Sequence, residues 1–222
     1  IRPPEDTSLI AHAIPKTGEL LPSIGMGTWI TFNVGRNLVL RQQRARVLKL
    51  FFAMGGTLVD SSPMYGSSEE VVGDNLKVTG SDKLFSATKT WTSSDSEAKN
   101  QFADSKALWG LPKFDLLQIH NLVAWKSHMS YLRELKEQGA IKYIGITTSH
   151  GRRHSEVKRI LNSQDVDFLQ LTYNLSDRKA ENELIPLAKE HGVAVICNRP
   201  FQGGRLPKVS SNAAVPMWAQ DI

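Results

Sequence analysis

Hydrophobic residues gather in seven short runs along the chain, and longer segments of mixed hydrophobic and polar residues separate them. These runs are nearly continuous in apolar residues, which is typical of strands that are covered on both faces. The segments between them have the composition of amphipathic helices. The pattern predicts alternating strands and helices, with strands at Gly25–Trp29, Thr57–Asp60, Leu84–Thr88, Phe114–His120, Lys142–Thr147, Phe168–Thr172 and Val193–Asn198.

Polar residues and glycines mark the ends of the predicted helices. Ser67 with Glu70, and Ser94 with Glu97, have the spacing of a capping box, in which a serine side chain begins a helix. Glycines close the helical segments and directly precede strands, as C-terminal caps do. They are Gly55–Gly56, Gly139 and Gly192.

Strand–helix units joined by short connections imply parallel strands with crossover helices. An open doubly wound sheet and a closed (β/α)8 barrel both fit, but the phosphate-binding pattern G-x-G-x-x-G of the open fold is missing. We therefore predict an α/β TIM barrel in which residues 1–222 form a single domain, preceded by a small β-hairpin at Ala13–Leu21. A complete barrel has eight units and about 250 residues, so we expect an eighth unit beyond Ile222. Because seven strands alone leave two edges unpaired, we expect this stretch by itself to be unstable.

Composition excludes several classes of protein. The chain has 222 residues, 41% of them hydrophobic, and no run of apolar residues approaches the length of a membrane span. The single cysteine excludes an internal disulfide framework. Excess positive charge, with 27 Lys and Arg against 22 Asp and Glu, raises the question of nucleic acid. The densest basic stretch, Arg41–Arg46, instead fits the solvated face of a helix, so we expect no nucleic-acid partner.

Four ionisable residues of different types follow three consecutive predicted strands. Asp60 ends the second strand and Tyr65 lies five residues later, Lys89 follows the third, and His120 ends the fourth. In a parallel barrel the carboxyl ends of the strands share one rim, where catalytic residues stand. Each residue alone also fits a structural role, as a helix cap, a rim aromatic, a solvated charge or a core histidine.

Together these four residues fit one chemical task. A tyrosine hydroxyl with its ordinary pKa near 10 exchanges protons poorly at pH 7, unless a cation such as Lys89 stabilises the phenolate. Asp60 can hold that lysine charged, and His120 can donate a hydrogen bond to a substrate oxygen. Such a set protonates an oxygen on which negative charge develops, which is half of a carbonyl reduction. Hydride from a nicotinamide would be the other half.

The motifs around these residues closely resemble those of the aldo-keto reductases, over about Ile14 to Arg205. The motifs are Gly27–Trp29, Val59–Gly66, Ala87–Trp91, Asp115–Asn121 and Ile144–Thr147. The resemblance implies a catalytic tetrad with Tyr65 as general acid, Lys89 and Asp60 as the pair that tunes it, and His120 as the orienting donor.

The same resemblance implies where a cofactor binds. NADP is expected, and NAD is left open. Asn198 departs from the aromatic residue that stacks on the nicotinamide in many members. Gly203 has two readings, a backbone contact to the pyrophosphate or a flexible turn. Trp29 and Trp91 are expected at the substrate mouth, with ordinary barrel packing as their alternative. The cofactor-binding residues implied are Thr28, Thr147, Thr148, Gln170, Asn198, Arg199, Pro200, Phe201 and Gly203.

The function expected is NAD(P)H-dependent reduction of a small aldehyde or ketone to an alcohol. The alternative is a catalytically weak nicotinamide-binding regulatory protein on the same fold. We expect no metal, because the strand ends lack a cluster of ligands and because four histidines lie on helices or loops as surface residues. A cytoplasmic location is expected, with an exported form left open. The four histidines are His128, His150, His154 and His191.

Overall fold

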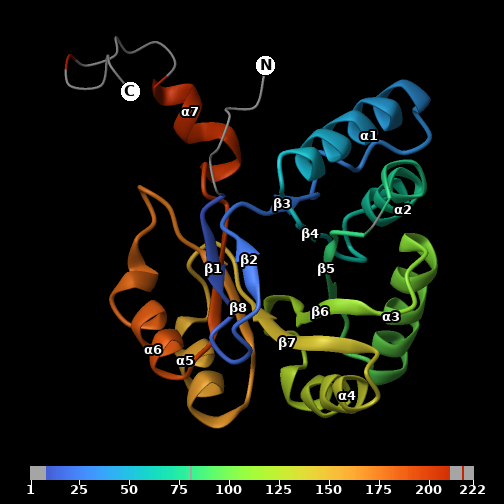
Figure 1. Ribbon diagram of the computed structural model, residues 1–222. Coiled ribbons are helices and arrows are strands. Elements are labelled where there is room, and N and C mark those ends of the chain that lie inside the picture. Colours follow the sequence, from blue (N-terminus) through green and yellow to red (C-terminus); the bar gives the residue numbers. More distant parts are fainter. Residues whose placement is uncertain (1–8, 81, 211–216, 218–222) are drawn as a thin grey trace.

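The computed structural model describes residues 9–80, 82–210 and 217. Seven parallel strands form one sheet in chain order, and helices surround it (Figure 1). The strands are β3 (Met26–Gly27), β4 (Leu58–Asp60), β5 (Phe85–Thr90), β6 (Phe114–Ile119), β7 (Ile141–Thr147), β8 (Phe168–Thr172) and β9 (Ala194–Asn198). The helices are α1 (Leu38–Ala53), α2 (Ser68–Thr79), α3 (Asp95–Trp109), α4 (Trp125–Glu137), α5 (His154–Ser163), α6 (Leu184–Glu190) and α7 (Arg205–Ser210).

This arrangement confirms the predicted barrel architecture of parallel strands and crossover helices. Within the described ranges, β3 and β9 are the two edge strands and are not paired with each other. The eighth unit is expected beyond Ile222 and so lies outside the described residues. Every helix in the described part of the chain is too short or too polar to cross a lipid bilayer.

The first strand is shorter than predicted. It ends at Gly27, because the chain then turns and Phe32 N–H donates to Thr28 O at 3.0 Å. The third strand is longer and includes Lys89 and Thr90. His120 follows β6 as the first residue of a 3₁₀ turn, so its position at the strand end is as predicted.

The predicted N-terminal hairpin is present. Strands β1 (Ala11–Ala13) and β2 (Leu20–Pro22) pair antiparallel, and Gly18 takes the positive φ of +74° that the tight turn requires. Ile14 is 2% exposed and packs with the residues that fill the barrel interior. The hairpin therefore covers the end of the barrel where the strands begin, opposite the end that carries the predicted site. The interior residues are Leu58, Phe85, Ala87, Leu116, Tyr143 and Phe168.

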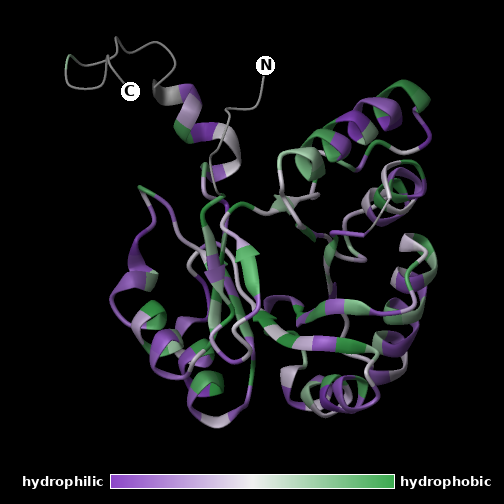
Figure 2. Cartoon of the chain, viewed as in Figure 1, coloured by the Kyte–Doolittle hydropathy of each residue, from purple (hydrophilic) through white to green (hydrophobic). Residues whose placement is uncertain are grey.

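A second and larger hydrophobic core lies between the outer face of the sheet and the helices. Figure 2 shows the contrast between the mainly hydrophobic central strands and the helices, which mix hydrophobic and hydrophilic residues. Alternate residues of β6 serve the two cores. Leu116 points into the barrel, whereas Leu117 and Ile119 pack against helices.

The helix caps were predicted with one error. The Ser94 side chain accepts a hydrogen bond from Glu97 N at 3.3 Å, and Gly139 and Gly192 have the positive φ of C-terminal caps. The capping box at Ser67 and Glu70 is wrong. Ser67 Oγ instead donates to Asn33 Oδ1 and accepts from Gly35 N–H. Its hydroxyl therefore binds a loop that is distant in sequence and does not cap the helix.

Candidate active site

Lys89 and Asp60 form a buried ion pair at the carboxyl end of the barrel. Lys89 has no exposed surface, and its ammonium donates to Asp60 Oδ2 at 2.6 Å and to Ser61 O at 2.7 Å. The other carboxylate oxygen, Asp60 Oδ1, accepts from Gln118 Nε2 at 2.9 Å. A buried ammonium requires such a partner, because desolvation of an unpaired charge costs several kcal/mol.

Tyr65 lies beside this pair, on the loop that follows β4. Lys89 Nζ is 5.3 Å from the centroid of its ring. The rings of His120 and Tyr65 meet edge to face at a centroid distance of 5.8 Å. The Trp29 ring is also near Tyr65, at a centroid distance of 6.5 Å. The four residues predicted as a tetrad are therefore brought together in one place.

The pKa of Tyr65 depends on its burial and on a neighbouring carboxylate. Burial, and then the negative charge of Asp60, raise the pKa of the phenol well above its usual value of 10. Tyr65 is therefore protonated at neutral pH, and transfer of its proton requires a neighbouring group that stabilises the phenolate.

His120 is buried and neutral. Burial, and then the positive charge of Lys89, lower the pKa of the imidazole to about 3. Its Nδ1 lies 3.0 Å from the hydroxyl oxygen of Ser62, which has no exposed surface. A neutral imidazole carries one proton, so it can donate one hydrogen bond to a substrate and accept another from the protein.

Several predicted cofactor-binding residues form one hydrogen-bonded network across the ends of β7, β8 and β9. Asn198 donates from Nδ2 to Thr148 O at 2.9 Å, and its Oδ1 accepts from the Thr172 hydroxyl at 2.6 Å. Thr147 Oγ1 accepts from Asn121 N–H at 2.9 Å. Gln170 is 5% exposed and is the register partner of Thr147. Asn198 thus ties the ends of three strands together, at the position where the resemblance implies an aromatic residue in many members.

Thr28 lies apart from that network, on the β3 side of the barrel. Its side chain is fully buried and donates to Ser61 Oγ at 2.8 Å. Thr28 therefore contacts the loop that carries Tyr65 rather than the β7–β9 network.

A cavity of about 320 Å³ adjoins the ends of β8 and β9. Arg199 and Arg205 both line it, and within the described residues neither guanidinium forms an ion pair. Arg205 donates from Nε and Nη2 to Gln202 Oε1 at 2.9 and 2.6 Å, so these hydrogen bonds go to a neutral amide. The cavity therefore suits an anionic group. Its other lining residues are His150, Thr172, Asn174, Asp177 and Gln202.

The glycine turn contributes less to this cavity than its sequence implies. Gly203 and Gly204 have positive φ, but Gly204 N–H already donates to Phe201 O at 3.0 Å within the turn. Phe201 is 63% exposed and Pro200 is exposed. The predicted substrate residues are exposed as well, Trp29 by 50% and Trp91 by 44%.

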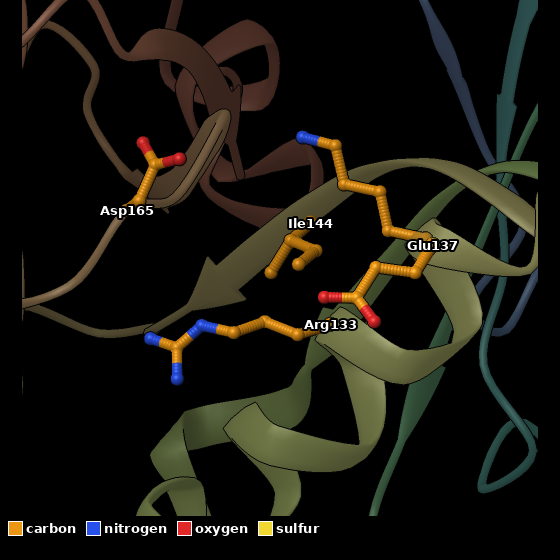
Figure 3. A pocket seen from close by; sticks show the side chains of 5 residues that line it. Arg133, Glu137, Ile144 and Asp165 are labelled. Carbon is orange, nitrogen blue, oxygen red and sulfur yellow. The ribbon is translucent and has the colours of Figure 1, made fainter.

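A second cavity, of about 310 Å³, lies near the opposite end of the sheet (Figure 3). Three of its charged residues have protein partners. Arg133 donates to Gln164 Oε1, Lys136 pairs with Asp167, and Asp165 pairs with Lys16. No predicted site residue lines it, so it is not the candidate active site.

The prediction that four histidines lie at the surface was wrong at one position. His128 is 1% exposed, because it lies on the inner face of α4. Across the residues that the structure describes, no group of three or more His, Cys, Asp or Glu side chains could hold a metal ion.

Sequence reasoning missed Gln118 and Ser62, which contact the predicted tetrad directly. Gln118 could have been found, because it precedes His120 by two residues on a strand and so lies on the same face. Ser62 lies in a loop, where no periodicity predicts the direction of a side chain.

Sequence comparison finds the same family. The chain matches the model of the Aldo/keto reductase family over residues 23–219. It is 27% identical over 194 residues to methylglyoxal reductase YeaE of Escherichia coli (strain K12), covering 84% of this chain and 66% of that protein. It is 26% identical over 198 residues to the NADH-specific methylglyoxal reductase of the same strain, covering 75% and 59%. The chain thus spans less than two thirds of the length of these relatives.

Solved structures share the fold. An aldo/keto reductase from Klebsiella pneumoniae in complex with NADP and acetate superposes with a TM-score of 0.77 at 22% identity, covering 91% of this chain and 72% of that one. The holo form of an aldo-keto reductase from Bacillus halodurans gives a TM-score of 0.77 at 23% identity, covering 95% and 71%.

Proposed function

Because this chain belongs to the aldo/keto reductase family, we propose that it is an NAD(P)H-dependent oxidoreductase that reduces an aldehyde or ketone to an alcohol. The observation that carries the proposal is the protonated phenol of Tyr65 beside the buried Lys89–Asp60 pair and the neutral His120. These residues match one chemical requirement, which is a proton delivered to an oxygen atom as negative charge develops on it.

Each residue has a distinct part in this proposal. Tyr65 is the general acid, and its raised pKa keeps the proton in place until an oxyanion forms beside it. The Lys89 ammonium stabilises the phenolate that remains, and Asp60 keeps that ammonium oriented. His120 donates one hydrogen bond to the substrate oxygen and so fixes its position for proton transfer.

The residues around the β8 and β9 ends fit a nicotinamide dinucleotide. Such a cofactor, when bound, supplies the hydride. Two guanidinium groups without a carboxylate partner, Arg199 and Arg205, suit its diphosphate. The polar side chains of Thr148, Gln170 and Asn198 suit the carboxamide, and the backbone of Gly203 is the proposed further contact to the diphosphate. Relatives bound to NADP or specific for NADH support NADP, with NAD open.

The proposed substrate is a small carbonyl compound. Two relatives are methylglyoxal reductases, which favours a short aldehyde. The exposed Trp29 beside Tyr65 offers an apolar wall at the mouth of the site.

The test is oxidation of NADPH by the purified protein, with and without methylglyoxal. We expect carbonyl-dependent oxidation that Tyr65→Phe abolishes while cofactor binding, measured by fluorescence, is kept. Tyr131→Phe, which alters a partly buried tyrosine on α4, is the matched control and should keep full activity. Turnover by Tyr65→Phe would contradict its assignment as the acid. Cofactor binding by the unaltered protein without turnover on a panel of aldehydes and ketones would favour the regulatory alternative.

A further inference from the structure

We propose that Gln118 is a positioning residue of the candidate active site, which fixes the Asp60 carboxylate so that one of its oxygens stays on Lys89. This inference rests on the proposed function, since it concerns how the general acid is supported. Gln118 has no exposed surface and so acts through Asp60 rather than on substrate.

The two oxygens of the Asp60 carboxylate accept hydrogen bonds from two different donors. Gln118 Nε2 donates to Oδ1 at 2.9 Å, and Lys89 Nζ donates to Oδ2 at 2.6 Å. Lys89 and Gln118 are register partners on β5 and β6, so their side chains leave the sheet at the same level. With both oxygens held, rotation of the carboxylate would break two buried hydrogen bonds.

The polarity of Gln118 supports a role beyond filling space. Within the described part of the chain, its carbonyl oxygen Oε1 is buried without a hydrogen-bond partner. A buried polar atom left unpaired is destabilising, and leucine or methionine at this position would avoid that cost. The amide therefore has an energetic cost, and its bond to Asp60 is the interaction that offsets it.

Gly145 on β7 makes room for this side chain. It is the register partner of Gln118, and a Cβ atom there would lie 2.8 Å from Gln118 Cγ and 3.1 Å from Leu116 Cδ1. Gly145 is not among the positive-φ glycines, so its backbone does not require glycine. The space it leaves lets Gln118 extend within the barrel interior towards Asp60.

Two substitutions of Gln118 distinguish positioning from packing. Gln118→Leu keeps the volume but removes the donor, and we expect kcat to fall about tenfold or more with little change in KM. Gln118→Glu restores a donor only while the introduced carboxyl is protonated. Burial and the neighbouring Asp60 carboxylate raise the pKa of that carboxyl, and we expect them to outweigh the opposing effect of Lys89, whose ammonium is already paired with Asp60. We therefore expect Gln118→Glu to be most active at low pH and to lose activity as pH rises, unlike the wild type and Gln118→Leu.

Gly145→Ala provides an independent test. If the added methyl group acts by displacing Gln118, it should lower kcat in the wild-type background and have little further effect in Gln118→Leu. Equal losses in both backgrounds would show that Gly145 acts on the barrel wall itself.

A measurement without turnover separates failure of this inference from failure of the proposed function. We expect Gln118→Leu and Asp60→Asn to be coupled by about tenfold or more in the unfolding equilibrium constant, whether or not the protein reduces carbonyls. Additive effects of these two substitutions would overturn the inference. A Gln118→Leu variant with wild-type kcat, in an active enzyme, would overturn it as well. Failure of the proposed function would appear instead as an inactive wild type in which the coupling is present.

Discussion

The hydroxyl oxygen of Ser62 lies 3.0 Å from Nδ1 of His120, and both side chains are buried. Because the imidazole is neutral, only one of its nitrogens carries a proton. If Ser62 donates to Nδ1, the proton stays on Nε2, where it can be donated to a substrate oxygen. Ser62 then selects the tautomer that the proposed reaction needs.

Replacing Ser62 by alanine should lower kcat by about tenfold, because the imidazole loses the hydrogen bond that selects its tautomer. Steady-state kinetics and the ¹⁵N chemical shifts of the His120 ring check the prediction. Ser61→Ala is the matched control, since its hydroxyl contacts Thr28 rather than the imidazole. An unchanged tautomer in Ser62→Ala would contradict the assignment.

The Lys89–Asp60 pair should be strongly non-additive in stability. Asp60→Asn leaves a fully buried ammonium without its carboxylate, which costs about 3–5 kcal/mol. Adding Lys89→Met removes that charge, so the double variant should be more stable than Asp60→Asn alone. Chemical denaturation of the four proteins measures the coupling, and all three variants should lack turnover. A double variant as unstable as the sum of its single variants would show that the two side chains act independently.

Much of the fold could be predicted because each strand is a compact hydrophobic run bounded by glycine or polar residues. The run Phe168–Thr172 matches β8 at both ends, and β7 begins one residue before its prediction. Errors arose where distant contacts override local signals. The Ser67 hydroxyl forms hydrogen bonds with Asn33 and Gly35 instead of capping its helix. Helix packing buries His128, although its sequence neighbours are mostly polar.

The spacing of Asp60, Tyr65, Lys89 and His120 along successive strands could predict that they meet, because parallel strands end at one rim. The pKa values and hydrogen bonds of these residues could not be predicted. The raised pKa of Tyr65 depends on burial and on the charge of Asp60 nearby. Likewise, the two carboxylate oxygens of Asp60 accept hydrogen bonds from Lys89 and from Gln118, and this depends on strand register and side-chain geometry that only the assembled barrel defines.

Because His120 is buried in its neutral form, the protein should be less stable in acid. The imidazole has a pKa of about 3 in the folded protein, against about 6.5 when unfolded. Between these values the unfolded state binds a proton that the folded state does not. The free energy of unfolding should therefore fall as pH decreases from about 6.5 to 3.

His120→Asn should remove this part of the pH dependence. Urea denaturation at a series of pH values, compared with the wild type, isolates the histidine from the carboxylates that also titrate. His191→Asn is the control, because His191 is exposed. Parallel curves for the wild type and His120→Asn would contradict a lowered pKa.

Gly73 on α2 should tolerate no side chain. In an ordinary helix interior, alanine in place of glycine stabilises by about 1 kcal/mol. A Cβ atom at Gly73 would lie 1.8 Å from the carbonyl oxygen of Leu108 and 3.0 Å from Trp109 Cα. These atoms belong to the backbone of α3, so no rotamer change relieves the contact, and the two helices must separate. We expect Gly73→Ala to destabilise the protein by about 2–4 kcal/mol, measured by chemical denaturation.

Val78→Ala, at an 80% exposed position of the same helix, should change stability by less than about 1 kcal/mol. A stabilised Gly73→Ala would mean that helix propensity outweighs the close approach of α2 and α3.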